Sequence, residues 1–396
     1  MISLDSARNL LLADIAPLAA ERVALRDAFG RVLAEDLVAR FDQPALPVSA
    51  MDGYAVTMRD AVAGKRLVVI GDAYAGSPFA GTLSRGQAVR IATGGVVPRG
   101  GDRVVVQELV ERDGDALIID GPLGDASFVR PAGGDFCAGD VLIEAGAMIS
   151  AARLGLAAAA SVASLAVRRR PRVAIFASGD ELREPGAALG PGEVANSAAF
   201  ALAALVEQWG GTADRRPVLP DDKAGATAMI SMAGEADVML FIGGASVGDR
   251  DVLRAVVADL GAAILFERIA VQPGKPSWHA RFPDGRLALG LPGNPASAFV
   301  CAHLLLEPLI AALQSRPSQC SLHPARLAGA LPGDNGRELW WRARLTIDPL
   351  GQRIVTPDPR RDSSLQRPLA EANALLRQPS GLTLHSGDVV EVIDLT

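Results

Sequence analysis

The spacing of hydrophobic positions changes three times along the chain, and each change predicts a different kind of structure. In residues 1–40 apolar side chains recur at helical spacing, first around Leu10 and Leu11 and then from Val23 to Leu33, so helices are expected there. From about 41 to 145 short apolar runs alternate with Gly, Pro and Asp, which predicts an all-β module. Residues 146–168 are expected to return to helix. Their alanine-rich stretch is too short to span a bilayer, so a buried helix is expected.

From Pro171 onward apolar strands and helices alternate. Residues 172–179 and 237–244 have the pattern of buried strands, and 196–211, 251–261 and 296–314 have that of helices. This alternation predicts a mostly parallel sheet covered by helices, whereas the tail from about 322 is strand-like and predicts a small β barrel. The expected fold class is therefore multidomain α/β. Its parts are a helical and extended linker region (1–45 and 141–168), an inserted β module (46–140), an α/β domain (169–318) and a C-terminal β barrel (322–396).

Composition and charge exclude several classes of function. The 396 residues carry a net charge of −6, which argues against a global attraction to nucleic acid or to an anionic membrane. Three widely spaced cysteines and four scattered histidines show neither a disulfide framework nor metal-ligand spacing. No targeting segment, nucleophile elbow or P-loop is apparent. The sequence therefore favours a protein of a reducing compartment with no nucleic acid or membrane partner.

Four loops of the α/β part share one design, in which an apolar strand ends in Gly and small polar residues. They are residues 177–182, 243–251, 272–276 and 291–295. Glycine lets backbone amides face a ligand, and a following helix N-terminus favours an anion. A phosphate or oxyanion is therefore expected at Gly243–Ser246 and Pro292–Asn294. Any one of these loops taken alone is more often only a tight turn and helix cap, but four on one sheet favour a site.

Acidic residues follow the same predicted strands. Because carboxylates and phosphate in one cleft repel each other unless a hard cation bridges them, the pattern predicts Mg²⁺. Helix capping is the alternative, and it stays open for Asp249 and for the Asp221–Asp222 pair. Lys275 is one of only three lysines, and it is either a point charge for an anion or a solvated surface residue.

The motifs together resemble one known family. SAMDGYA (49–55), GGASVGDRD (243–251), PGKP (273–276) and LPGNP (291–295) occur in the order found in the molybdopterin molybdenumtransferase family, the MoeA-type proteins related to the E domain of gephyrin. The resemblance runs nearly from end to end. It implies a cytoplasmic homodimer that dimerises through the linker region, with a cleft between the α/β domain of one subunit and the SAMDGYA domain of the other.

The resemblance also implies the reaction, which is Mg²⁺-dependent insertion of molybdate into adenylylated molybdopterin with release of AMP. The implied partners are the pterin nucleotide and molybdate, with the adenylylating protein and recipient molybdoenzymes as further partners. By position in the family motifs, the catalytic residues would be Asp52, Thr93, Glu181, Asp251 and Lys275. The cofactor-binding residues would be Ser178, Gly179, Asp180, Gly243, Gly244, Ser246, Pro292, Gly293, Asn294, Arg342 and Ser363. The metal ligands would be Glu181, Asp221, Asp222, Asp251 and Asp135.

Three departures from the family pattern leave alternatives open. Ala177 stands where the family usually has Ser or Thr, Gln272 where it usually has Lys, and Val48 where a polar residue is common. A lost charge-assisted contact is worth about 1.5–3 kcal/mol, enough to weaken oxyanion capture. A pterin-binding carrier or scaffold without turnover is therefore a second hypothesis. An unrelated nucleotide-binding transferase on the same scaffold is a third.

Overall fold

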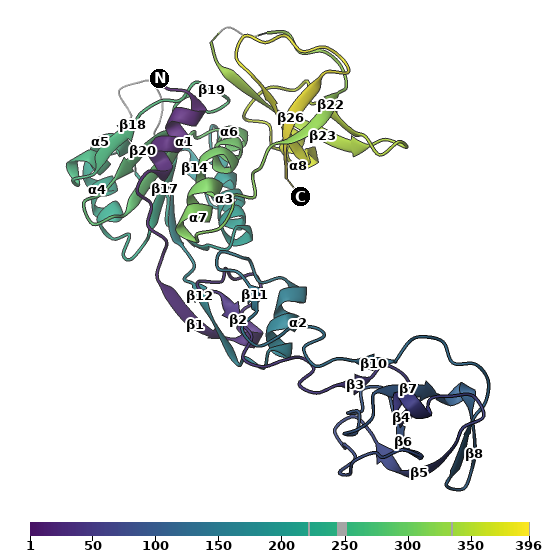
Figure 1. Cartoon of the computed structure of the whole chain (residues 1–396). Coiled ribbons are helices and arrows are strands. Elements are labelled where there is room, and N and C mark those ends of the chain that lie inside the picture. Colours follow the sequence, from purple (N-terminus) through teal and green to yellow (C-terminus); the bar gives the residue numbers. More distant parts are fainter. Residues whose placement is uncertain (221, 244–251, 334–335, 396) are drawn as a thin grey trace. The chain divides into compact units, whose positions relative to one another are not determined.

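A computed structural model describes residues 1–220, 222–243, 252–333 and 336–395 (Figure 1). The predicted site residues Asp221, Gly244, Ser246 and Asp251, and Asp249 beside them, lie outside this part of the chain. The chain divides into two compact units. The first comprises residues 1–21, 30–32 and 166–396, and the second comprises residues 22–29 and 33–165.

The α/β part of the first unit is built on a six-stranded sheet with the order β16-β13-β17-β21-β20-β18. Four neighbouring strands are parallel, as the alternation predicted: β16 (Thr212–Arg215), β13 (Arg172–Ala177), β17 (Val238–Ile242) and β21 (Leu287–Leu291). Two antiparallel strands complete the edge, β20 (Trp278–Arg281) and β18 (Ala263–Phe266). The last residues of β13, β17 and β21 are register partners, so the loops that follow these strands begin side by side.

Helices cover the two faces of this sheet, because alternate residues of each buried strand point to opposite sides. One face packs with α1 (Leu4–Leu12), α3 (Ser197–Gln208), α6 (Pro295–Cys301), a π-helical turn (Ala302–Leu306) and α7 (Glu307–Leu313). The other face packs with α4 (Lys223–Ser231) and α5 (Val252–Asp259). Among the described residues, the helical run Pro295–Leu313 has the length and apolarity of a membrane span, but 89% of that window is buried inside the protein. It is a core helix of this fold.

The C-terminal part of the first unit is a closed five-stranded barrel, which confirms the predicted β barrel. Its strands are β22 (His323–Leu327), β23 (Glu338–Ile347), β24 (Arg353–Pro357), β25 (Ala374–Gln378) and β26 (Val389–Asp394). The barrel closes because β23 pairs with both β24 and β25. The short strand β19 (Val271–Gln272) pairs with β23 and brings a loop of the α/β part to the barrel. Helix α8 (Gln366–Glu371) follows β24.

The second unit contains the predicted β module. Its six-stranded sheet comprises β4 (Gly53–Val56), β5 (Arg66–Ala73), β6 (Gln87–Ile91), β7 (Arg103–Val106), β8 (Val110–Asp113) and β9 (Ala116–Ile119). Gly53 is the glycine of the SAMDGYA motif, and a Cβ there would lie 2.1 Å from the carbonyl oxygen of Val105, so only glycine fits. Short strand pairs join β2 (Leu37–Val38) to β11 (Val141–Ile143) and β3 (Val48–Ser49) to β10 (Val129–Arg130). Single 3₁₀ turns lie at Leu25–Asp27, Met58–Asp60 and Gln107–Leu109.

Two helix predictions are wrong. Residues 20–24 form strand β1 (Ala20–Ala24) and residues 164–168 form strand β12 (Ser164–Arg168), which pair with each other. A partner about 140 residues away in sequence satisfies this backbone, and local apolar spacing carries no information about such a partner. Helix α2 (Ala151–Ala159) does form, but it ends before Ser161, which has a positive φ of 56°. Only Ala157 of α2 is buried, so the expected buried helix is also wrong.

Candidate functional site

The loops after β13, β17 and β21 meet at the carboxyl edge of the sheet. The amide of Ser178 donates to the carbonyl of Ile242 at 3.0 Å, and the amide of Gly243 donates to that of Leu291 at 3.1 Å. These loops line a cavity of 670 Å³, which we call the amide cavity. It brings together six of the predicted site residues, namely Ser178, Glu181, Gly243, Pro292, Gly293 and Asn294. Gly179 and Asp180 belong to the same loop but do not line the cavity.

Glycines allow two of these turns to approach each other closely. Gly243 has a φ of +89°, and a Cβ there would lie 2.7 Å from the carbonyl oxygen of Ser178. A Cβ on Gly293 would lie 3.3 Å from the Cα of Gly243. Side chains at these positions would therefore force the turns apart. Most of the anion site predicted at Gly243–Ser246 lies outside the described residues, and the one at Pro292–Asn294 stays a prediction.

Two helices begin at the amide cavity. Asn196 precedes α3 and Asn294 precedes α6, and both asparagines line the cavity. Neither side chain caps its own helix. The first-turn amides of α3 therefore have no side-chain acceptor at the cap position, and such amides favour an anion. Asn294 uses its side chain elsewhere, because its Nδ2 donates to the Oγ of Ser363 at 2.8 Å.

Glu181 is the carboxylate of the amide cavity. Its side chain folds over Gly179, since a Cβ at Gly179 would lie 2.7 Å from both carboxylate oxygens. Short strands β14 (Leu182–Arg183) and β15 (Val194–Ala195) pair beside it, and the amide of Val194 donates to the Glu181 carbonyl at 2.9 Å. In the described residues this carboxylate has no ion pair, so it is available to a cation. Mg²⁺ commonly takes one or two carboxylates plus phosphate oxygens, and Glu181 fits that requirement.

The other predicted metal ligands differ in their surroundings. The Oδ1 of Asp222 accepts from the amide of Gly225 at 2.8 Å and caps α4, so the capping interpretation is confirmed for this residue. Asp135 lies exposed in the second unit, where its amide donates to the carbonyl of Gln43. Across the described ranges no three His, Cys, Asp or Glu side chains come together in a metal-binding group. The metal roles of these residues stay predictions.

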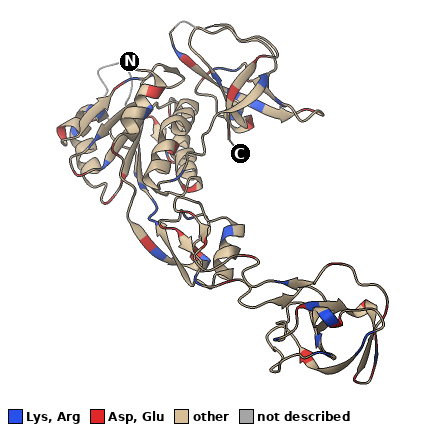
Figure 2. Cartoon of the chain, in the orientation of Figure 1, with Lys and Arg blue, Asp and Glu red and all other residues tan. Residues whose placement is uncertain are grey.

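A second cavity, of 320 Å³, adjoins the amide cavity, and Pro276 lines both. We call it the cationic cavity, because five basic residues and one acidic residue line it: Lys275, Arg337, Arg342, Arg360, Arg361 and Asp358. Basic and acidic residues are otherwise interspersed over both units, as Figure 2 shows, so this concentration of charge is local. Of the predicted site residues it contains Lys275, Arg342 and Ser363.

Lys275 differs from the other two lysines of the chain. The ammonium groups of Lys65 and Lys223 form ion pairs with Asp60 and Asp259. Within the part of the chain that the structure describes, the exposed Lys275 has no such partner. Its positive charge is therefore available to an anionic ligand in the cationic cavity.

Gln272 occupies the same cavity without a charge. Its side chain is half-buried, and its Oε1 is buried with no hydrogen-bond partner among the described residues. An unsatisfied buried acceptor costs about 1–3 kcal/mol. Gln272, which stands where the family usually carries a lysine, thus has a side-chain oxygen that lacks a hydrogen-bond donor in the described structure.

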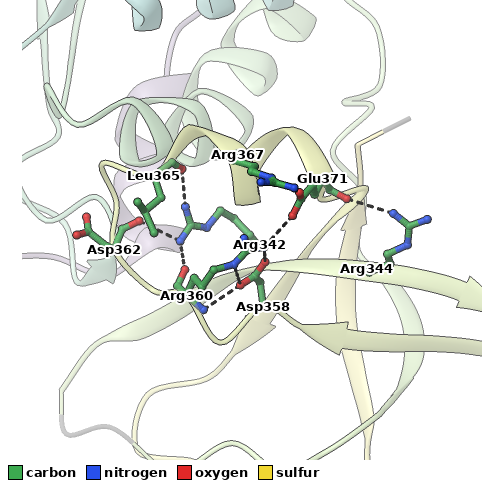
Figure 3. A network of polar contacts seen from close by, with 8 residues as sticks. All are labelled: Arg342, Arg344, Asp358, Arg360, Asp362, Leu365, Arg367 and Glu371. Carbon is green, nitrogen blue, oxygen red and sulfur yellow. Dashed lines mark hydrogen bonds and ion pairs between the residues drawn. The ribbon is translucent and has the colours of Figure 1, made fainter. Parts of the chain in front are cut away.

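Arg342 lines the cavity, and backbone carbonyls hold its guanidinium in place (Figure 3). Its guanidinium donates to the backbone carbonyls of Leu365 at 2.9 Å, of Asp362 at 3.0 Å, and of Arg360. These bonds hold the loop that carries Ser363. Arg337, Arg360 and Arg361 were missed from the sequence, because no local motif marks them and only the barrel fold brings them to this cavity.

In the second unit the structure brings Asp52 and Thr93 together. The amide and the hydroxyl of Thr93 donate to the same Oδ1 of Asp52, at 2.7 and 2.9 Å. The Thr93 amide is the main cause that holds the pKa of Asp52 below its ordinary value. This carboxylate is therefore ionised at neutral pH. The catalytic roles predicted for the two residues stay predictions.

Comparisons with known proteins agree over the whole chain. Three family models match consecutive parts: "MoeA N-terminal region (domain I and II)" over residues 2–161, "Probable molybdopterin binding domain" over 174–312, and "MoeA C-terminal region (domain IV)" over 324–395. A Haemophilus influenzae protein named molybdopterin molybdenumtransferase is 35% identical over 80% of this chain and 78% of its own length. The chain belongs to the molybdopterin molybdenumtransferase family. Molybdopterin molybdenumtransferases are transferases of molybdenum cofactor biosynthesis, so the unrelated nucleotide-binding transferase of the third hypothesis is wrong.

Further relatives support this membership in the molybdopterin molybdenumtransferase family. A Nostoc protein of the same name is 36% identical over 95% of this chain and 88% of its own length. A solved molybdopterin biosynthesis MoeA protein from Pyrococcus horikoshii superposes with a TM-score of 0.87 at 28% identity, covering 100% of this chain and 99% of that one. The fold expected from the resemblance is thus confirmed.

Proposed function

We propose that this chain inserts molybdenum from molybdate into molybdopterin that arrives adenylylated, with Mg²⁺ present and AMP released. The observation that carries the proposal is the pairing of two adjoining cavities with different chemistry. The amide cavity offers backbone donors and helix N-termini, and the cationic cavity offers a concentration of positive charge. An anionic pterin nucleotide suits the first, and a small oxyanion suits the second.

In the amide cavity the phosphates of the nucleotide would lie against the turns at Gly243 and Gly293 and the first turn of α3. Exposed amides stabilise such charge without the cost of ordering long side chains. Glu181 stands at the same cavity and would repel phosphate on its own. Mg²⁺ would supply positive charge that offsets the repulsion between the Glu181 carboxylate and the phosphates. Glu181 is the described residue that would hold it.

In the cationic cavity molybdate would lie beside Lys275, whose ammonium is a compact point charge with three donors. Ser363 lines this cavity, and its Oγ already accepts from Asn294, which leaves the hydroxyl proton for an oxyanion. Asn294 lines the amide cavity, so this hydrogen bond links the two sites. Molybdate would therefore be held next to the bound pterin.

We also propose that the chain acts in the cytoplasm as a homodimer, and that it receives the pterin from an adenylylating protein and passes the product to molybdoenzymes. The family resemblance supports these points. Asp52 and Thr93 are assigned to the same reaction. An ionised carboxylate held by two hydrogen bonds is suited to hold a cation.

The purified protein supplied with adenylylated molybdopterin, Mg²⁺ and molybdate tests the proposal. We expect AMP release, and a product that activates a molybdenum-free molybdoenzyme. The measurements are chromatography of AMP and the activity of the recipient enzyme. Tight pterin binding without either outcome would support the carrier hypothesis instead.

A further inference from the structure

The loop between β24 and α8 forms one wall of the cationic cavity and carries Ser363. It reaches the α/β part at Ser363, whose carbonyl accepts from the amide of Ala296 at 3.1 Å while its Oγ accepts from Asn294. Gln366 follows the loop, and its Nε2 donates to the Oγ of Ser197 at 2.6 Å. The position of this loop therefore decides how Ser363 lines the cationic cavity and meets Asn294 of the amide cavity.

Two groups of contacts fix the loop from the barrel side (Figure 3). The first is the set of carbonyl contacts of Arg342. The second is an ion-pair cluster centred on Arg360. Its Nε and Nη2 donate to the two carboxylate oxygens of Asp358 at 2.9 and 2.6 Å, and Nη2 also donates to Oε2 of Glu371 at 2.8 Å. Glu371 is the last residue of α8, so this cluster ties the start of the loop to the end of the helix that follows it.

The members of the cluster differ in their access to the cavity. Asp358 and Arg360 line the cationic cavity, whereas Glu371 does not. Glu371 is bound on its other side by Arg367, whose Nε donates to Oε1 at 2.8 Å. The Arg367 side chain is 86% exposed and also lies outside the cavity. The Glu371 carboxylate thus forms two ion pairs. Its partner Arg360 lines the cationic cavity, and its partner Arg367 does not.

We propose that Glu371 is a positioning residue for the oxyanion site. It acts through Arg360. The Glu371–Arg360 ion pair holds the loop between β24 and α8 so that Ser363 meets Asn294, and it keeps the Arg360 guanidinium at the wall of the cationic cavity. The proposal rests on the proposed function, since it takes molybdate as the ligand of the cationic cavity. Glu371 itself does not line the cationic cavity.

The competing explanation is that Arg360 binds the oxyanion directly. The two explanations predict opposite results for Glu371→Gln. If Glu371 positions the loop, its loss weakens molybdate binding. If Arg360 is a direct ligand, removing its carboxylate partner frees the guanidinium and leaves binding unchanged or tighter.

The test uses titration calorimetry of the full-length protein with sodium molybdate alone. We expect Glu371→Gln and Arg360→Gln each to weaken binding about three- to fivefold, the size expected when a partly exposed ion pair is lost. Arg360→Lys keeps one ion pair and should restore part of the affinity. The control Arg367→Gln removes the other partner of Glu371 and should stay within about twofold of wild type. In turnover assays, Glu371→Gln should raise KM for molybdate and leave kcat unchanged.

Hydrogen exchange of the 358–366 backbone amides separates failure of this inference from failure of the proposed function. We expect faster exchange in Glu371→Gln and Arg360→Gln than in Arg367→Gln, with equal thermal midpoints. A wild-type protein that does not bind molybdate would count against the proposed function, and the exchange data would still decide the positioning role. Unchanged exchange, or molybdate binding in Glu371→Gln as tight as in wild type, would overturn the inference.

Discussion

The Nδ2 of Asn294 donates a 2.8 Å hydrogen bond to the Oγ of Ser363, 69 residues further along the chain. This bond joins the turn after β21 to the loop before α8. Asn294 lines the amide cavity and Ser363 the cationic cavity, so the bond lies where the two cavities adjoin. The two predicted site residues are thus coupled to each other.

We expect Asn294→Ala and Ser363→Ala each to weaken molybdate binding, because either change loosens the link between the cavities. The double variant should be less impaired than the two single effects combined, with a coupling free energy of about 0.5–1.5 kcal/mol, the worth of one hydrogen bond. Titration calorimetry of the four proteins measures it. Strictly additive effects would show that the bond plays no part in binding.

Lys275→Met should weaken molybdate binding about 10- to 100-fold, because it removes a charge-assisted contact. Lys223→Met is the matched control, since Lys223 pairs with Asp259 on the surface of the molecule. Its affinity for molybdate should equal that of wild type. Since Lys275 is exposed and has no ion pair in the described structure, Lys275→Met should not lower the thermal midpoint. Lys223→Met loses an exposed ion pair, which is worth at most about 1 kcal/mol. Equal affinity of both variants for molybdate would show that Lys275 does not bind it.

Gln272→Lys should tighten molybdate binding about tenfold, because it adds a cation at the oxyanion cavity and removes the unsatisfied Oε1. Gln272→Met serves as the control that removes the amide without adding charge. AMP release measured in parallel tests the carrier hypothesis, which expects turnover in Gln272→Lys and none in wild type. Weaker binding by Gln272→Lys would contradict this assignment.

Glu307 and Arg316 form a buried ion pair, with 0% and 3% of their side chains exposed and 2.9 Å between Oε1 and Nη1. Glu307→Ala leaves the arginine buried without its partner and should lower the free energy of unfolding by about 3–5 kcal/mol. Glu235→Ala removes the exposed partner of Arg172 and should change it by less than about 0.5 kcal/mol. Urea unfolding followed by circular dichroism compares the two. Similar losses in both would show that burial of the pair is not decisive.

His279 makes the folding stability of the protein depend on pH. Its Nδ1 faces the Ala288 carbonyl at 2.9 Å and must donate, so the buried Nε2 is unprotonated and has no partner in the described structure. Burial is the main cause that lowers its pKa to about 4, and nearby Arg281 adds to it. The unfolded chain, with an ordinary pKa of about 6.5, binds the proton more readily, so stability falls as pH drops from about 6.5 to 4.

The free energy of unfolding should fall by about 3 kcal/mol through His279 by the low end of this pH range. Urea unfolding at several pH values measures it. His279→Asn keeps a donor for the Ala288 carbonyl and cannot titrate, so its stability should vary less with pH between 4 and 6.5. A slope equal to that of wild type would assign the acid sensitivity to other groups.

Much of the amide cavity could be predicted, because parallel strands end at one edge and the residues that follow them must lie near one another. Ser178, Gly243 and Asn294 meet for this reason. In the cationic cavity the sequence predicted three residues, Lys275 from the scarcity of lysine and from the family resemblance, and Arg342 and Ser363 from the resemblance alone. Arg337, Arg360 and Arg361 lie on barrel loops whose neighbours depend on the pairing of β19 with β23. That pairing joins segments about 67 residues apart, and no local pattern encodes it.

By itself, the sequence determined the alternation of strands and helices, the glycine-rich turns and the family, because each depends on residues close together in the chain or on an ordered set of motifs. Tertiary structure alone decided that residues 20–24 pair with 164–168 as strands and that Arg342 holds a loop. It also decided that Glu371 binds Arg360, a residue of the cationic cavity. Each of these outcomes depends on which distant backbone or side chain satisfies a polar group, and that is settled only when the chain has folded.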